Sequence, residues 1–195
     1  MGALERQRQL QREAAAVLAD LDVLPRLREF GHPVQVGSVA LGLMVARDID
    51  LTVLCPALDT SAIFGAAAAL ASHPRVRELL LRDDTGSWNI DPDYPDGILW
   101  RPRYRSVAGD EWTLDIWFIH EDSRQFDLVH LESLPPRLTD EKRLAILRIK
   151  EACLGRPWYS SYGIYVAVLD HGVRTPEGFR TYVEGGSTPV RKFGA

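Results

Sequence analysis

The segment 36–51 constrains the fold of this chain more than any other part of the sequence. It reads as the end of a strand, a Gly37-Ser38 turn, a short helical stretch and a second strand that carries Asp48 and Asp50. Alternate residues of a strand point to one face of a sheet, so the two carboxylates lie side by side. A glycine lets backbone amides approach an anion closely, and a hydroxyl with the free amides of a helix start can bind phosphate. The segment therefore predicts that carboxylates and a phosphate-binding turn converge.

A third acidic residue joins this pair from a later strand. In the stretch 111–118, polar and apolar residues alternate, and Asp115 lies on the face opposite Leu114. Three clustered carboxylates repel one another unless cations lie between them. Mg²⁺ takes oxygen ligands, and two such ions ~3.5–4 Å apart can hold the attacking and leaving oxygens of an in-line displacement. The pattern predicts a two-ion Mg²⁺ site, and its ligands would also be the catalytic residues: Asp48, Asp50 and Asp115.

The other elements follow from the hydrophobic pattern. Strands are expected at 32–36, 48–54, 76–82, 98–105 and 112–120. Helices are expected at 10–24, 60–72, 139–154, 160–171 and 175–185. The predicted class is α/β (α+β), with a mixed, mainly antiparallel sheet, helices on one side and a small C-terminal helical lobe. The expected divisions are a main domain at 1–125, the helical lobe at 126–186 and a tail at 187–195.

The Gly-Ser turn and the acidic residues together resemble a known superfamily. Gly37-Ser38, then nine intervening residues, Asp48-Ile49-Asp50 and a lone strand Asp115, are similar to the motifs of the DNA polymerase beta-like nucleotidyltransferases. Leu41 stands where that superfamily frequently has Thr. The resemblance covers roughly residues 30–170. It implies a nucleotidyltransferase fold, and an enzyme that moves a nucleoside monophosphate from a nucleoside triphosphate to an acceptor hydroxyl with release of pyrophosphate.

The helical part of the chain carries a second resemblance. Lys150, followed by Ser160, Ser161 and Tyr162, is similar to the Lys and Ser-Ser-Tyr pattern of template-independent terminal nucleotidyltransferases. The resemblance implies that the Lys and Ser residues hold the triphosphate beside the Gly37-Ser38 turn and that the Tyr stacks on the base. A Lys point charge suits phosphate, and a Tyr face suits any base. Each residue also has a structural alternative: a solvated helix charge, a helix cap and a packed aromatic ring.

Charge bears on the acceptor. Lys and Arg number 23 against 27 Asp and Glu, and the net charge of −4 disfavours nucleic acid as a partner. A small-molecule acceptor, as in antibiotic nucleotidyltransferases, fits this balance. A protein acceptor, as in AMPylating antitoxin-type enzymes, is the alternative; RNA tailing ranks third, and a catalytically silent nucleotide-binding module is a rival of another class. In the loop 82–97, an acidic lip for a cationic acceptor is one interpretation of five residues: Asp83, Asp84, Asp91, Asp93 and Asp96.

The cysteines and the hydropathy pattern indicate in which cellular compartment to expect the protein. Cys55 and Cys153 lie 98 positions apart without a CxxC pair, which indicates neither a disulfide framework nor a zinc site. The first residues lack the apolar core of a signal peptide, and the longest apolar run, 62–71, is about half of a membrane span. We therefore expect a cytoplasmic protein without a membrane segment. The sequence leaves the oligomeric state open.

Overall fold

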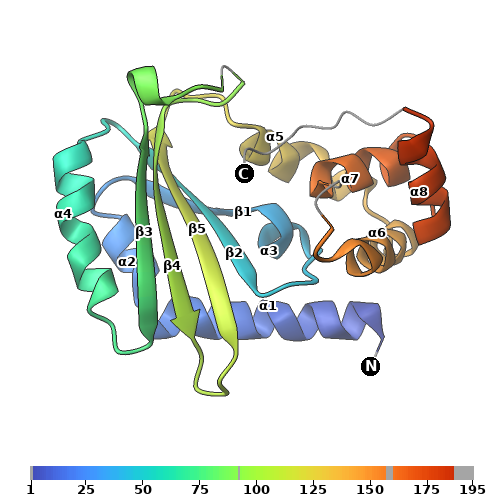
Figure 1. Ribbon diagram of the computed structural model, residues 1–195, viewed down its shortest axis with the longest axis horizontal. Helices are drawn as coiled ribbons and strands as arrows, with labels where there is room; N and C mark the ends of the chain where they lie inside the picture. Colours follow the sequence, from blue (N-terminus) through green and yellow to red (C-terminus); the bar gives the residue numbers. More distant parts are fainter. Residues whose placement is uncertain (1, 92, 157–159, 187–195) are drawn as a thin grey trace.

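A five-stranded mixed sheet forms the centre of the computed structural model, which describes residues 2–91, 93–156 and 160–186 (Figure 1). The strands are β1 (His32–Val36), β2 (Asp48–Cys55), β3 (Val76–Asp84), β4 (Gly97–Arg105) and β5 (Glu111–His120). Their order is β1-β2-β5-β4-β3, in which β2 and β5 are parallel and the other neighbours are antiparallel. The predicted mixed, mainly antiparallel sheet is confirmed.

One face of this sheet is covered by α1 (Ala3–Asp20), α2 (Val23–Leu27) and α4 (Thr60–Ala71) (Figure 1). Leu10, Ala14 and Val17 repeat at helical spacing along α1, and all three are buried against the sheet. The alternate residues of β2 and β5 that point to this side, such as Ile49 and Leu114, are fully buried. Because the strands alternate, their intervening side chains point to the opposite face, which these helices leave open.

A second hydrophobic cluster lies beside the open face. It is built mainly from α6 (Asp140–Cys153), α7 (Ser161–Leu169) and α8 (Pro176–Glu184), and it includes Leu41 and Leu43. Leu41 ends the short helix α3 (Gly37–Leu41), which follows β1 directly. The second cluster therefore draws on both parts of the sequence, and the division at residue 125 stays a prediction. The predicted tail, 187–195, lies outside the described residues.

Helix α5 (Phe126–Ser133) lies between the last strand and the 3-10 helix η2 (Pro135–Arg137), at the start of the predicted helical lobe, where no individual helix was expected. No side chain caps its first turn, and none of its residues is fully buried. Gln125, just before the helix, accepts a buried hydrogen bond from the Thr52 hydroxyl at 2.9 Å instead. The helix is thus positioned by a contact between residues that are 73 positions apart in sequence. A local sequence pattern cannot predict such a contact.

Several boundaries differ from the sequence expectation. The helix expected at 10–24 is divided into α1 and α2, because Asp22 has a left-handed φ of +47°. Strand β3 extends to Asp84, and the loop that follows contains the 3-10 helix η1 (Gly86–Trp88). Helix α7 ends at Leu169, two residues before the expected end. None of the helices in the described part of the chain is long and apolar enough to cross a membrane.

Candidate active site

Strand register brings the predicted carboxylates together. In the parallel pair of β2 and β5, Asp50 lies opposite Asp115, and Asp48 lies two residues earlier on the same face of β2. The neighbouring residues on both strands belong to the buried core, so the alternation of the strands forces these acidic side chains onto the open face. Asp48 is exposed, whereas Asp50 is half-buried.

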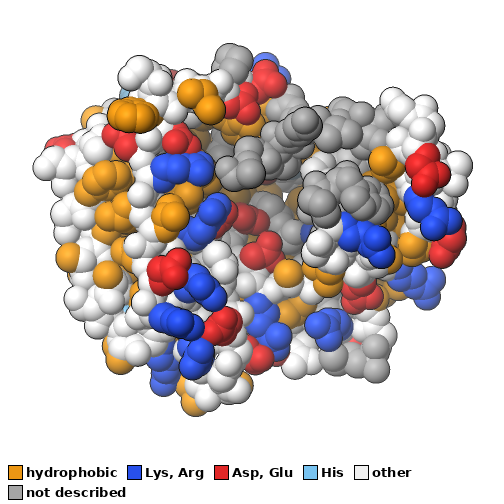
Figure 2. All heavy atoms as spheres, viewed as in Figure 1, with side chains coloured by type: hydrophobic (Ala, Val, Ile, Leu, Met, Phe, Trp, Pro, Cys, Tyr) orange, Lys and Arg blue, Asp and Glu red, His pale blue; other side chains and the backbone are white. Residues whose placement is uncertain are grey.

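These carboxylates line a cavity of about 1010 Å³ between the sheet and the helical cluster. Figure 2 shows acidic side chains at the floor of this hollow and Lys or Arg side chains beside them on the sheet. Ligand pockets commonly have volumes of about 300–1,000 Å³, so this cavity lies at the large end of that range. Most of the residues expected to bind the nucleotide also line it: Gly37, Ser38, Ser160, Ser161 and Tyr162.

Asp50 is the most strongly perturbed carboxyl group of the site. Burial raises its pKa first, and the negative charges of Asp48, Asp115 and Asp127 raise it further, to about 8. The positive charge of Lys150 opposes this shift. At neutral pH the Asp50 carboxyl is therefore largely protonated, and a cation at the site would favour its ionised form.

Gly37 is required by its closeness to Asp50. Its φ of +62° lies in the left-handed region, and a Cβ atom at this position would meet Asp50 Oδ2 at 2.3 Å. Any other residue would push the carboxylate away or distort the turn. The spacing between the Gly-Ser turn and the acidic pair thus corresponds to direct contact in space.

Arg101 neutralises the third carboxylate. Its Nε donates to Asp115 Oδ1 at 2.6 Å and its terminal nitrogen donates to Oδ2 at 2.8 Å, a two-pronged ion pair between neighbouring strands. Arg101 was not among the site residues predicted from the sequence. The sequence predicts that Arg101 lies on the strand 98–105. It does not predict that this strand pairs with the strand 112–120, and this pairing places Arg101 beside Asp115.

The donor set fits a hard divalent cation, although the described residues include no group of three His, Cys, Asp or Glu side chains arranged to hold one. Carboxylate oxygens are the preferred ligands of Mg²⁺. Burial and, after it, the neighbouring carboxylates raise the pKa of Asp50, and a bound cation would favour the ionised form of this group. Asp48 and Asp50 can offer oxygens directly, while both oxygens of Asp115 are engaged by Arg101.

Lys150 lies beneath the Gly-Ser turn, not on the cavity wall. Only 4% of its surface is exposed, and its Nζ donates to Ser38 Oγ at 2.7 Å and to the Leu43 carbonyl at 3.0 Å. The alternative of a solvated helix charge is therefore wrong. The structure brings Lys150 and Ser38 together as predicted, but Lys150 reaches the cavity through the serine hydroxyl.

The Ser-Ser-Tyr segment lines the cavity and is also engaged inside the protein. Ser160 Oγ accepts a hydrogen bond from the Gly163 amide at 3.0 Å and so caps α7, as the structural alternative expected. The ring of Tyr162 stacks on His130, with centroids 5.2 Å apart and planes at 17°. His130 belongs to α5, the unpredicted helix, and its Nδ1 lies 3.9 Å from Asp127. Burial raises the pKa of Asp127, and the charge of His130 opposes the rise.

The acidic loop carries an apolar rim. Asp96 accepts hydrogen bonds from the Gly86 amide and the Asn89 side chain, which lower the pKa of Asp96 and hold the loop in shape. At the mouth of the cavity, Trp88 is 73% exposed and Ile90 is 92% exposed. The loop therefore presents large apolar side chains to the cavity along with carboxylates.

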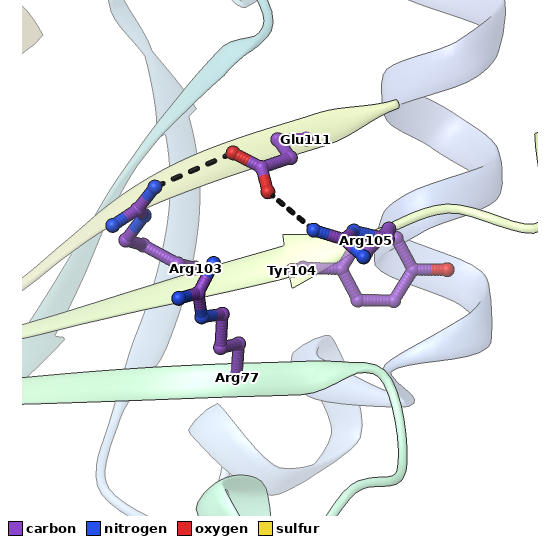
Figure 3. A pocket seen from close by; sticks show the side chains of 5 residues that line it. All are labelled: Arg77, Arg103, Tyr104, Arg105 and Glu111. Carbon is purple, nitrogen blue, oxygen red and sulfur yellow. Dashed lines mark hydrogen bonds and ion pairs between the residues drawn. The ribbon is translucent and has the colours of Figure 1, made fainter. Parts of the chain in front are cut away.

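A second pocket lies near the far end of β3, β4 and β5 (Figure 3). Glu111 accepts hydrogen bonds from Arg103 at 3.3 Å and Arg105 at 2.8 Å, and these arginines lower the pKa of Glu111. This pocket has a volume of about 10 Å³, which holds one water molecule at most. The pocket is an ion-pair cluster, lined by Arg77, Arg103, Tyr104, Arg105 and Glu111.

Comparison with known proteins defines the class of fold. No family model and no curated protein matches the sequence. Solved structures do match: a mutant Cid1 poly(U) polymerase bound to MgATP has a TM-score of 0.57 at 18% identity, over 83% of this chain and 50% of that one. Cid1 with MgGTP bound gives 0.56 at 19% identity, over 83% and 50%. A cytoplasmic RNA terminal U-transferase gives 0.51 at 18% identity, over 83% and 46%.

The likeness extends along most of this chain, which spans about half the length of these polymerases. The mixed sheet, its flanking helices and the adjacent helical cluster form a nucleotidyltransferase fold. The fold expectation from the sequence is therefore confirmed.

Proposed function

We propose that this chain is a Mg²⁺-dependent nucleotidyltransferase that moves a nucleoside monophosphate from a nucleoside triphosphate to an acceptor hydroxyl. The observation that carries the proposal is the strand register, which sets Asp50 opposite Asp115 on the open face with Asp48 beside them. The Gly37-Ser38 turn adjoins the same carboxylates. Structures with this fold are described with MgATP and MgGTP bound, which supports a triphosphate and Mg²⁺ as ligands here.

The residues have distinct roles in this proposal. Asp48 and Asp50 hold Mg²⁺, and Asp115 completes the site. When bound, the metal neutralises phosphate charge and lowers the pKa of the acceptor hydroxyl. The turn amides and the Ser38 hydroxyl bind phosphate oxygens, and Lys150 fixes that hydroxyl from behind.

The helical side of the cavity completes the nucleotide site in this proposal. Ser160 and Ser161 lie at the N-terminus of α7, whose free amides suit the triphosphate. Tyr162 offers a flat face to the base, and His130 backs its ring. The nucleotide therefore lies against α7 while its α-phosphate faces the carboxylates.

For the acceptor we propose a small molecule, as in antibiotic nucleotidyltransferases. The net charge of −4 disfavours a long polyanion, and the cavity is large enough for a compact acceptor beside the nucleotide. Trp88 and Ile90 would contact its apolar part, and Asp84 and Asp91, which also line the cavity, would attract its cationic groups.

An RNA 3′ end is the second candidate acceptor. Arg82 lies over the Trp117 ring, 5.2 Å from its centroid, and both residues line the cavity on its sheet side. Together with exposed Trp88, these side chains offer stacking surfaces for bases. The matching structures include an RNA terminal U-transferase and Cid1 with its short product ApU.

The test is a labelling screen. The full chain is incubated with Mg²⁺ and each α-labelled nucleoside triphosphate, together with aminoglycosides, a 3′-hydroxyl RNA oligonucleotide or no acceptor, and the products are separated. The Asp48→Asn, Asp50→Asn double variant is the matched control.

Label on a small molecule that disappears in the double variant supports the first acceptor. Label on RNA would support an RNA 3′ end as the acceptor in place of a small molecule. Label on the protein itself would indicate a protein-modifying enzyme. Absence of both transfer and a Mg²⁺-dependent shift of melting temperature by any triphosphate would overturn the proposed activity.

A further inference from the structure

Among the three strand carboxylates of the candidate site, Asp115 alone has a cationic hydrogen-bond partner in the described structure. Arg101 donates hydrogen bonds to both carboxylate oxygens of Asp115, at 2.6 and 2.8 Å, in the geometry of a strong bidentate pair. Asp50, directly opposite Asp115 in the register, receives no comparable contact. One carboxylate is therefore already neutralised while two are left for an incoming cation.

We propose that Arg101 is a positioning residue that competes with the divalent cation for Asp115 and releases this carboxylate when the metal binds. The inference rests on the proposed function, because it takes Asp115 as a metal ligand. In the metal-free protein, Arg101 would hold the third ligand in a closed ion pair. The site would thus favour metal that arrives with the triphosphate over metal alone.

The surroundings of the pair permit this exchange. The Arg101 side chain is 40% exposed and that of Asp115 is 28% exposed, so the guanidinium can turn toward solvent without leaving a buried charge unpaired. A dication on Asp115 and a guanidinium on the same oxygens would repel each other. The two cations therefore compete for one carboxylate.

The neighbouring Arg103 provides a matched comparison on the same strand and face. It pairs with Glu111 at 3.3 Å and with Glu78 at 3.6 Å, and its side chain is 44% exposed. It differs from Arg101 mainly in its partner, since neither Glu111 nor Glu78 belongs to the carboxylate cluster. Removing Arg103 changes the charge of the sheet face by the same amount and leaves Asp115 untouched.

The experiment titrates the full-length chain with Mn²⁺ alone, without nucleotide, and measures binding by calorimetry and by the paramagnetic signal of free Mn²⁺. Arg101→Met should bind Mn²⁺ about three- to tenfold more tightly than the wild type, which corresponds to the loss of a partly exposed charged hydrogen-bond pair. Arg101→Lys, which cannot form the two-pronged pair, should fall between them. Arg103→Met should bind like the wild type.

A second background tests whether the gain passes through Asp115. In Asp115→Asn protein, the further change Arg101→Met should leave Mn²⁺ affinity unchanged, because the contested carboxylate is gone. Circular dichroism confirms that each variant is folded, and Arg101→Lys carries the test if Arg101→Met does not fold.

The outcomes separate this inference from the proposed function. Equal or weaker Mn²⁺ binding by Arg101→Met, or an equal gain in Arg103→Met, would overturn the competition while nucleotide transfer by the wild type still supports the enzyme. If neither wild type nor Arg101→Met binds Mn²⁺ and no triphosphate is transferred, both ideas fail.

Discussion

The strand side and the helical side of the cavity differ in how far their polar groups are already engaged within the protein. On the strand side, Asp48 and Asp50 face the cavity, and burial together with repulsion by neighbouring carboxylates raises the pKa of Asp50 to about 8. On the helical side, Lys150 is bonded to Ser38 and Tyr162 stacks on His130. The strand side is thus electrostatically incomplete without a ligand, whereas the helical side is already organised.

This difference indicates where ligand binding changes the protein most. A cation on the strand side relieves repulsion between carboxylates, so its binding couples to protonation and to stability. A nucleotide on the helical side adds to contacts that exist without it. Substitutions on the strand side should therefore affect the chemistry, and substitutions on the helical side should affect affinity and local packing.

The largest effect is expected for Asp50→Asn. Loss of this metal-binding charge should lower the rate of nucleotidyl transfer by about 10³-fold or more, beyond the ~10²–10³ lost with one transition-state donor. Asn preserves the shape but removes the repulsion, so at pH 9 without metal the variant should melt at a higher temperature than the wild type. Labelled-nucleotide assays and circular dichroism measure the two effects. The control is Asp84→Asn at saturating acceptor, because Asp84 lines the same cavity on the proposed acceptor side and pairs with Arg82. Equal losses of maximal rate in both variants would contradict the assignment.

The second effect is a pH dependence of metal binding. The pKa of Asp50 is raised from its ordinary value to about 8, so the folded protein binds a proton that the unfolded chain has lost between pH ~4 and 8. Without metal, stability should therefore fall as pH rises through this range.

Mg²⁺ must displace the same proton, so its apparent affinity should increase by up to about tenfold per pH unit between pH 6 and 8. Calorimetry in buffers of different ionisation enthalpy counts the released proton. A pH-independent affinity, or an unchanged pH profile in Asp50→Asn, would show that this carboxyl group is not the one displaced.

The contrast between the two sides also explains what the sequence could predict. The carboxylate cluster follows from the period of two in a strand, a local rule that fixes the face of Asp48, Asp50 and Asp115 once their strands are placed. Gly37 could be assigned because the Gly-Ser turn precedes the acidic pair by only nine intervening residues. The sheet class followed from the same alternation.

Long-range contacts could not be predicted in this way. The pair between Arg101 and Asp115 depends on the register of two strands, and the pair between Lys150 and Ser38 spans 112 positions. Helix α5 has no capping side chain and no fully buried residue, so its helical pattern was weak. These features arise from packing between distant segments, which one sequence does not specify.

The third prediction concerns Lys150→Met, which keeps the apolar stem and removes the charge. The change leaves the Ser38 hydroxyl and the Leu43 carbonyl without their buried donor and should lower the free energy of unfolding by about 1–3 kcal/mol. It should also weaken triphosphate binding, because Ser38 is no longer held. Chemical denaturation and calorimetry measure both. The matched control is Arg148→Met, an exposed position on the same helix. Full stability of Lys150→Met would mean that the helical side is less organised than proposed.

The smallest effect is expected at the stack of Tyr162 and His130. Tyr162→Ala should weaken triphosphate binding by about 1–3 kcal/mol, the contribution of one base stack, with similar losses for all four bases. His130→Ala removes the ring behind Tyr162 and should cost less, about 0.5–1.5 kcal/mol, because the face offered to the base is retained. In both variants the maximal rate at saturating nucleotide should stay near that of the wild type, since neither residue belongs to the proposed metal-binding set of Asp48, Asp50 and Asp115. A fall in maximal rate with unchanged affinity would place this stack on the chemical side of the comparison and not on the binding side.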